Sequence, residues 1–136
     1  MSASFTIALD AMGGDNAPAI VVKGADLARR RFPGIRFRMF GDEARILPMM
    51  KRRKRLREIT EICHTDDVIS NEMTVSVALR KGRQSSMQLA INDVREGEAA
   101  GVVSAGNTGA LMAMAKLSLR TLPGIDRPAI AAIFPT

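Results

Sequence analysis

The feature that most constrains the fold is a series of short, largely apolar runs that are separated by helical patterns. The runs cover Phe5 to Leu9, Ile35 to Phe40, Glu58 to His64, Gly101 to Ser104 and Ala129 to Phe134. Strands that are apolar on both faces are typical of parallel sheets with helices on each side. The sequence therefore predicts an α/β fold with a doubly wound, mainly parallel sheet.

Helical patterns fill the gaps between these runs. The expected helices run from Pro18 to Arg31, from about Glu43 to Met50, from Gln84 to Glu96 and from Ala110 to Leu119. The helix in 84–96 carries apolar residues at i, i+3, i+4 and i+7, so we expect one of its faces to pack against the rest of the protein. The helix in 110–119 is apolar almost all round, which predicts burial on more than one side.

Length and composition set broad limits on the class of protein. The 136 residues are 46% hydrophobic and 25% charged, as in a globular protein, and we expect no internal domain boundary. The single cysteine, Cys63, rules out an internal disulfide framework and a Cys-rich zinc site, and it fits a reducing cytoplasm. No apolar run in this stretch approaches the ~20 residues that span a bilayer.

The net charge of +6 is a local feature. The segment from Lys51 to Arg57 contains six cations, and the remaining basic and acidic residues balance. Its candidate partners are nucleic acid, an anionic membrane surface or an acidic protein, and the alternative is a solvated helix end or loop. The chain has no Trp or Tyr and only five Phe, so no stacking platform supports nucleic acid, which we do not expect as a partner.

Ligands of open parallel sheets bind at the carboxyl ends of the strands, so the loops there hold the candidate site. The first loop, Asp10 to Pro18, contains Gly13 and Gly14, which let the backbone approach a ligand closely. Asp10 and Asp15 could hold a metal, orient a cation or cap the helix. No further carboxylate cluster accompanies them, and we expect no metal.

The second loop lies between the run 101–104 and the following helix. Backbone N–H groups at the helix start, with Ser104, Gly106, Asn107, Thr108 and Gly109, offer a cradle for a phosphate-sized anion. The loop is neither a Walker loop nor a dinucleotide fingerprint. The alternative is a plain strand-to-helix turn that Asn107 or Thr108 caps.

A third segment places cations just before a helix that opens with hydroxyl groups. Lys81 and Arg83 precede Ser85 and Ser86, a combination that again favours an anion. Lys81 has the alternative of being a solvated surface charge. No catalytic residue is assigned, because there is no Gly-x-Ser-x-Gly elbow and the adjacent Cys63 and His64 point to opposite faces of a strand.

Four motifs in order carry a family resemblance. They are Leu9-Asp10-Ala11-Met12-Gly13-Gly14-Asp15-Asn16-Ala17-Pro18, Arg83-Gln84-Ser85-Ser86-Met87, Ser104-Ala105-Gly106-Asn107-Thr108-Gly109-Ala110-Leu111 and Gly124-Ile125-Asp126-Arg127-Pro128-Ala129. With these motifs the chain resembles the PlsX family, the bacterial phosphate acyltransferases of phospholipid synthesis. The resemblance implies a fold similar to isocitrate and isopropylmalate dehydrogenases. Family members are longer, so residues 1–136 resemble an N-terminal α/β portion.

The implied activity is transfer of a fatty acyl group from acyl carrier protein to inorganic phosphate, without a cofactor. The product, acyl phosphate, would be consumed by a membrane glycerol-3-phosphate acyltransferase that makes phosphatidic acid. The implied enzyme is a homodimer when full length, cytoplasmic and peripheral at the inner face of the membrane. Residues 106–109 would hold phosphate with help from Lys81 or Arg83, Ser85 and Ser86. The alternatives are a phosphotransacetylase-like transferase, or an anion-binding module that uses residues 51–57.

Overall fold

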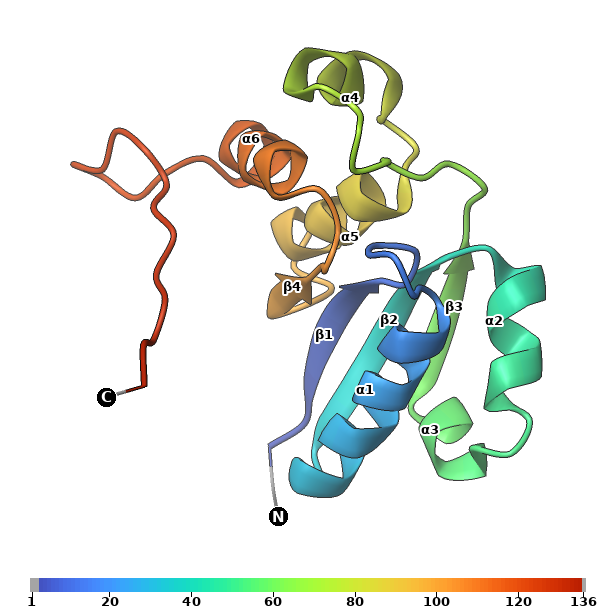
Figure 1. Cartoon of the computed structure of the whole chain (residues 1–136). Helices are drawn as coiled ribbons and strands as arrows, with labels where there is room; N and C mark the ends of the chain where they lie inside the picture. Colours follow the sequence, from blue (N-terminus) through green and yellow to red (C-terminus); the bar gives the residue numbers. More distant parts are fainter. Residues whose placement is uncertain (1–2, 136) are drawn as a thin grey trace.

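The computed structural model describes residues 3–135, which form one parallel sheet with helices on both of its faces (Figure 1). The strands are β1 (Phe5–Asp10), β2 (Ile35–Gly41), β3 (Thr60–His64) and β4 (Gly101–Val103). They lie in the order β3-β2-β1-β4, and each neighbouring pair is parallel. The predicted fold class is confirmed, and so are four of the five predicted strands.

The helices divide between the two faces of the sheet. Three of them, α1 (Ala19–Arg31), α2 (Glu43–Met50) and α3 (Lys54–Glu58), pack on one face. On the other face lies α5 (Ser86–Arg95), against which α6 (Thr108–Leu119) packs, with α4 (Val75–Lys81) beside α6 (Figure 1). Neither α3 nor α4 follows from the apolar pattern, because both are short, and each buries only one residue, Leu56 and Ala78 respectively.

Alternating strand residues build a separate core on each face, as the period of two in a strand requires. Leu9, Phe37 and Met39 face the α1 side and pack with Val22 of α1. On the opposite side, the neighbouring strand residues Ala8 and Phe40 pack with Ala90 of α5. The sheet is thus buried between two layers, and its polar loops are left at its ends.

Two expectations for the C-terminal quarter of the chain are wrong. Residues 129–134 form no strand, and Ile133 is 98% exposed. The segment leaves the body of the molecule after α6 (Figure 1) and has neither a ladder partner nor buried side chains to hold it extended. The apolar helix α6 is likewise covered on one side only: Ala110 and Met114 are buried, whereas Leu117 is 67% exposed.

Candidate functional site at the carboxyl edge of the sheet

The loops that follow β1 and β4 meet the start of α5 around one buried carboxylate, Asp10 at the end of β1. Its Oδ1 accepts a hydrogen bond from the hydroxyl of Ser86 at 2.6 Å and from the backbone N–H of Met12 at 3.2 Å. Its Oδ2 accepts from the hydroxyl of Ser104 at 2.8 Å, and Ser104 Oγ in turn accepts from the backbone N–H of Gly106. Asp10 therefore fixes three chain segments at the carboxyl edge.

Glycine at position 13 lets these segments approach one another. A Cβ at Gly13 would lie 2.7 Å from Asp10 Oδ2, 2.9 Å from Ser104 Oγ and 3.0 Å from the backbone nitrogen of Gly106. The next residue, Gly14, has φ +98°, a conformation that L side chains rarely adopt. The paired glycines thus allow a close approach between segments of the chain itself, and their approach to a ligand stays a prediction.

Ser85 and Ser86 are fully buried and their hydroxyls already have partners. Ser85 Oγ caps α5 by accepting from the backbone N–H of Gln88 at 3.1 Å, and it donates to the carbonyl oxygen of Gly82 at 2.7 Å. Ser86 Oγ donates to Asp10. In this structure both hydroxyls organise the start of α5, and their role in holding phosphate stays a prediction.

Asn107 combines the cap of α6 with a link to a distant loop. Its Oδ1 accepts from the backbone N–H of Ala110 at 3.1 Å, which caps the helix. Its Nδ2 donates to the carbonyl oxygens of Ser70 at 3.1 Å and Met73 at 2.9 Å. Thr108 and Gly109 follow on the exposed surface, and the first N–H groups of a helix have no partner inside it. The groups of this loop that remain open are therefore the first backbone N–H groups of α6 and the exposed side chain of Thr108.

The structure does not join Lys81 and Arg83 to the start of α6. Both side chains are exposed, and no ion pair or hydrogen bond involves either within the described part of the chain. Gly82, which lies between them, packs against α6 beyond its first turn. A Cβ at Gly82 would lie 2.9 Å from Cε of Met114, which is more than one turn past the start of the helix. Their assistance to phosphate also stays a prediction.

Asp15 has a partner that the sequence analysis missed. Its Oδ1 accepts from Nδ2 of Asn71 at 3.1 Å, so the β1 loop contacts the loop that follows β3. Between the two loops lies a pocket of about 200 Å³ lined by Met12, Gly14, Asp15, Val68, Ile69, Ser70, Asn71 and Glu72. Only the three-dimensional fold reveals this pairing, because the two residues are 56 positions apart.

Three possible metal ligands lie beside the carboxyl ends of the strands, and two of them already take part in hydrogen bonds. Ligand atoms of Asp42, His64 and Asp66 lie within 4.8 Å of one another. Nδ1 of His64 accepts from the backbone N–H of Glu43 at 3.1 Å, so the neutral ring carries its proton on Nε2, which faces Asp66 Oδ1 at 3.3 Å. Two of the three possible ligands, His64 and Asp42, thus already accept hydrogen bonds from backbone N–H groups at the start of α2.

The sheet and the loops at its end place the chain in a class of proteins. A parallel α/β sheet whose glycine-rich loops and helix starts gather at its carboxyl edge is the arrangement of α/β proteins that bind anionic ligands there. The family described as "fatty acid synthesis protein" matches residues 5–136, and the chain belongs to this family.

Curated relatives agree with this assignment. The chain is 60% identical over all of its 136 residues to a phosphate acyltransferase of Rhodospirillum rubrum, and 57% identical to one of Paramagnetospirillum magneticum. It spans 39% of the length of each of these two relatives. Within residues 3–135, no helix combines the length and the apolar character that a membrane span requires.

Proposed function

We propose that this chain contributes to the transfer of a fatty acyl group from acyl carrier protein to inorganic phosphate. The observation that carries the proposal is the meeting of three sequence motifs at the carboxyl edge of the sheet, in a chain whose relatives are named phosphate acyltransferases. Asp10 holds the motifs together, and the start of α6 is left open beside them. This is the position at which open α/β sheets bind their ligands.

In the candidate site, some groups hold the loops in place and others are available to bind the ligand. The side chains of Asp10, Ser86 and Ser104 hold the loops, so phosphate binding falls to the backbone N–H groups of Thr108 and Gly109 and to the exposed hydroxyl of Thr108. The positive end of the α6 dipole favours the anion at the same place. Lys81 or Arg83 would add charge if the long side chains reach the bound ion.

In the proposed reaction an oxygen of phosphate attacks the carbonyl carbon of the thioester. A new C–O bond forms, the C–S bond breaks, and the carrier leaves as a thiolate that takes up a proton from water. Positioning and stabilisation of the oxyanion are sufficient for such an activated substrate, so no covalent acyl-enzyme is required. The product is an acyl phosphate.

The proposal also gives the chain a place in phospholipid synthesis. A membrane glycerol-3-phosphate acyltransferase would consume the acyl phosphate on the way to phosphatidic acid. We place the protein in the cytoplasm, peripheral at the inner face of the membrane, as the N-terminal portion of an enzyme that is a homodimer when full length. The exposed apolar residues of α6, such as Leu117, are available for contacts with further chain or with a second copy.

The test is phosphate-dependent release of thiol from an acyl carrier protein that carries a fatty acyl thioester. It is run on this chain and on the Rhodospirillum rubrum relative, with and without phosphate and with the matched coenzyme A thioester. We expect the relative to release thiol in a reaction that requires phosphate and prefers the carrier-bound donor, and release by the relative alone would show that residues 1–136 need further chain for activity. Release that is independent of phosphate in both proteins would refute the proposal, and preference for coenzyme A would favour the phosphotransacetylase-like alternative.

A further inference from the structure

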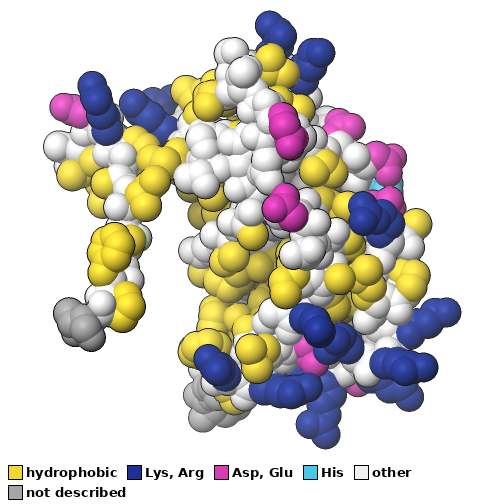
Figure 2. Space-filling view, viewed as in Figure 1, with side chains coloured by type: hydrophobic (Ala, Val, Ile, Leu, Met, Phe, Trp, Pro, Cys, Tyr) yellow, Lys and Arg dark blue, Asp and Glu magenta, His cyan; other side chains and the backbone are white. Residues whose placement is uncertain are grey.

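An apolar groove lies between α1 and the edge strand β4. In the register of the sheet, Leu9 of β1 pairs with Val103 of β4, so both side chains point to the face that α1 covers. Leu9 is buried there with residues of α1, whereas Val103 is 57% exposed. Figure 2 shows hydrophobic side chains along this face. The groove has a volume of about 410 Å³, within the roughly 300–1,000 Å³ that ligand pockets occupy.

The lining of this groove is almost entirely hydrocarbon. Its floor comes from strand residues such as Leu9 and Phe37, and one wall comes from the residues of α1 that face the sheet and β4, which are Ile20, Val21, Gly24, Ala25 and Ala28. Among the lining residues, all within the described range 3–135, Asp10 is the only one with a polar side chain. Both of its carboxylate oxygens already accept hydrogen bonds from the chain itself. The groove therefore suits an apolar ligand.

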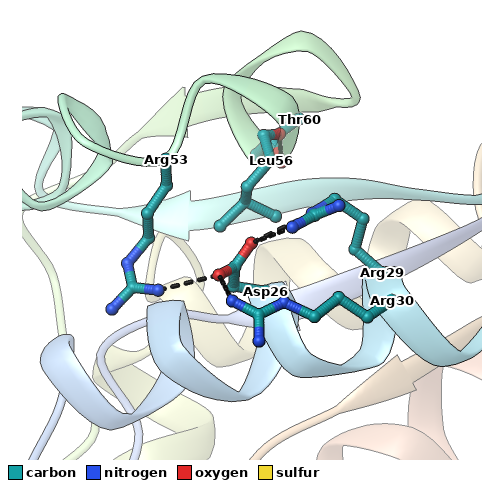
Figure 3. Close-up of polar contacts among 6 residues, drawn as sticks. All are labelled: Asp26, Arg29, Arg30, Arg53, Leu56 and Thr60. Carbon is teal, nitrogen blue, oxygen red and sulfur yellow. Dashed lines mark hydrogen bonds and ion pairs between the residues drawn. The ribbon is translucent and has the colours of Figure 1, made fainter.

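Contacts on its opposite face hold α1 in place as the wall of the groove. The helical repeat puts Asp26 on the side of α1 that faces away from Gly24. Asp26 is 5% exposed, and its oxygens lie 2.9 Å from Arg29, 3.3 Å from Arg30 and 2.8 Å from Arg53, which directly precedes α3 (Figure 3). A movement of α1 toward β4 would pull Asp26 away from Arg53. The groove is thus a fixed feature of the fold.

One end of the groove lies at the candidate site. Asp10 and Ala105 line this end, and Ala105 belongs to the loop that is proposed to hold phosphate. The other end is at Ile35, which pairs with Phe5 at the start of β1. From Phe5 to Asp10 the strand advances by five residues, or about 17 Å. An extended chain of about 14 carbons has this length, because each C–C bond of about 1.5 Å advances it by about 1.25 Å.

We propose that this groove holds the hydrocarbon chain of the fatty acyl donor. The carbonyl carbon lies at the loop around Ala105, and the methyl end points toward Ile35. The inference rests on the proposed acyl transfer, which supplies a ligand of this kind, and it adds the place of the chain and a limit on its length. An apolar segment of polypeptide is the competing occupant, but its backbone N–H and C=O groups would find no partners in this lining.

Calorimetric titration with free fatty acids from octanoate to stearate tests the groove without phosphate or carrier. We expect the affinity to rise about fourfold with each methylene up to about 14 carbons and then to level off. Absence of myristate binding, or an affinity that does not depend on chain length, would overturn the proposal. Loss of phosphate-dependent thiol release alone would refute only the acyl transfer, so the two proposals fail separately.

Photo-cross-linking locates the bound chain. Myristate with a diazirine near its methyl end should label residues at the far end of the groove, such as Ala28 and Ile35. Labelling of the exposed face of α6 around Leu117 in their place would contradict the assignment. The same experiment is run on the Rhodospirillum rubrum relative, of which this chain spans 39%. Labelling of the groove in this chain but not in the relative would show that further polypeptide occupies it, which would also overturn the proposal.

A leucine in the groove should shorten the chain that fits. Gly24 lines the groove midway along α1, and a Cβ there meets nothing within 4 Å, so Gly24→Leu fills the groove without crowding the core. We expect myristate binding to weaken by at least about tenfold and octanoate binding to stay unchanged. The control Ala19→Leu adds a leucine at an exposed position on the opposite face of α1 and should keep wild-type binding. Thermal unfolding verifies that both variants are folded, and equal losses in the two would refute the assignment.

Discussion

The hydroxyl of Ser86 donates a hydrogen bond of 2.6 Å to Oδ1 of Asp10, across 76 residues of sequence. Asp10 ends β1 and Ser86 begins α5, so this bond ties the sheet to the helix that covers its second face. Both side chains are buried, and within residues 3–135 every fully buried side-chain nitrogen or oxygen has a hydrogen-bond partner. The contact therefore belongs to the framework of the candidate site, and its removal should affect folding before chemistry.

Asp10→Asn tests this role. The amide keeps one acceptor oxygen but replaces the other with an N–H donor, so one of the hydroxyls of Ser86 and Ser104 loses its acceptor in a buried place. We expect the free energy of unfolding to fall by about 2 kcal/mol, measured by urea denaturation. The control Asp15→Asn changes an exposed carboxylate and should cost no more than about 0.5 kcal/mol. Equal effects at the two positions would contradict the framework role.

Gly13→Ala tests the close approach of the loops. A methyl group there would lie 2.7 Å from Asp10 Oδ2 and 3.0 Å from the backbone nitrogen of Gly106, so the loops must move apart. We expect a loss of about 2 kcal/mol in the free energy of unfolding. In the control, Gly24→Ala, the methyl group meets nothing within 4 Å on an exposed turn of α1. It should stabilise the protein by about 0.5–1 kcal/mol, and a loss at Gly24 as large as at Gly13 would show that crowding is not the cause.

The sequence predicts which loops form the site, but it does not predict the hydrogen bonds between them. Apolar runs and turn residues identify the strands and the loops that follow them, and the topology of parallel sheets brings those loops together. Whether Ser86 faces a ligand or Asp10 depends on the packing of α5 on the sheet, which no local pattern encodes. Asn107 shows the same limit: the sequence offers it as a capping residue, whereas its bonds to Ser70 and Met73 depend on the path of a loop.

The two wrong expectations have a common physical reason. The run 129–134 and the helix α6 are apolar, and apolar patterns indicate which residues prefer burial without showing what buries them. Leu117 and Ile133 are exposed in this chain, which spans 39% of the length of the Rhodospirillum rubrum relative. The helix α4 was missed for the opposite reason, since a cap by Thr74 and the burial of Ala78 suffice for its seven residues.

Asn107→Asp should release the loop that Asn107 holds. The new carboxylate can still cap α6, but an oxygen replaces the N–H donor that faces the carbonyl oxygens of Ser70 and Met73. Loss of both bonds and repulsion between oxygens should cost about 2 kcal/mol. Hydrogen exchange followed by mass spectrometry should show faster exchange in residues 70–74. The control is Asn16→Asp, the same change at an exposed position, and it should leave that exchange unchanged.

Asp26→Asn should destabilise the protein in a manner that depends on pH. Burial opposes ionisation of Asp26, but Arg29, Arg53 and Arg30 outweigh it, so its pKa in the folded state lies below the ordinary value. A carboxyl group with a lowered folded pKa contributes stability above its unfolded pKa of about 3.9, and that contribution is lost as pH falls through the folded value. The arginines are partly exposed, so we expect a loss of about 2 kcal/mol at pH 7.

Urea denaturation at several pH values between 7 and 2.5 measures this dependence. The difference in the free energy of unfolding between wild type and Asp26→Asn should be constant near neutrality and should shrink only below about pH 4. The control Asp126→Asn alters an exposed carboxylate outside the helices and strands and should follow wild type throughout. A difference that persisted unchanged at pH 2.5 would mean that Asp26 stabilises the junction of α1 and α3 through packing and not through its charge.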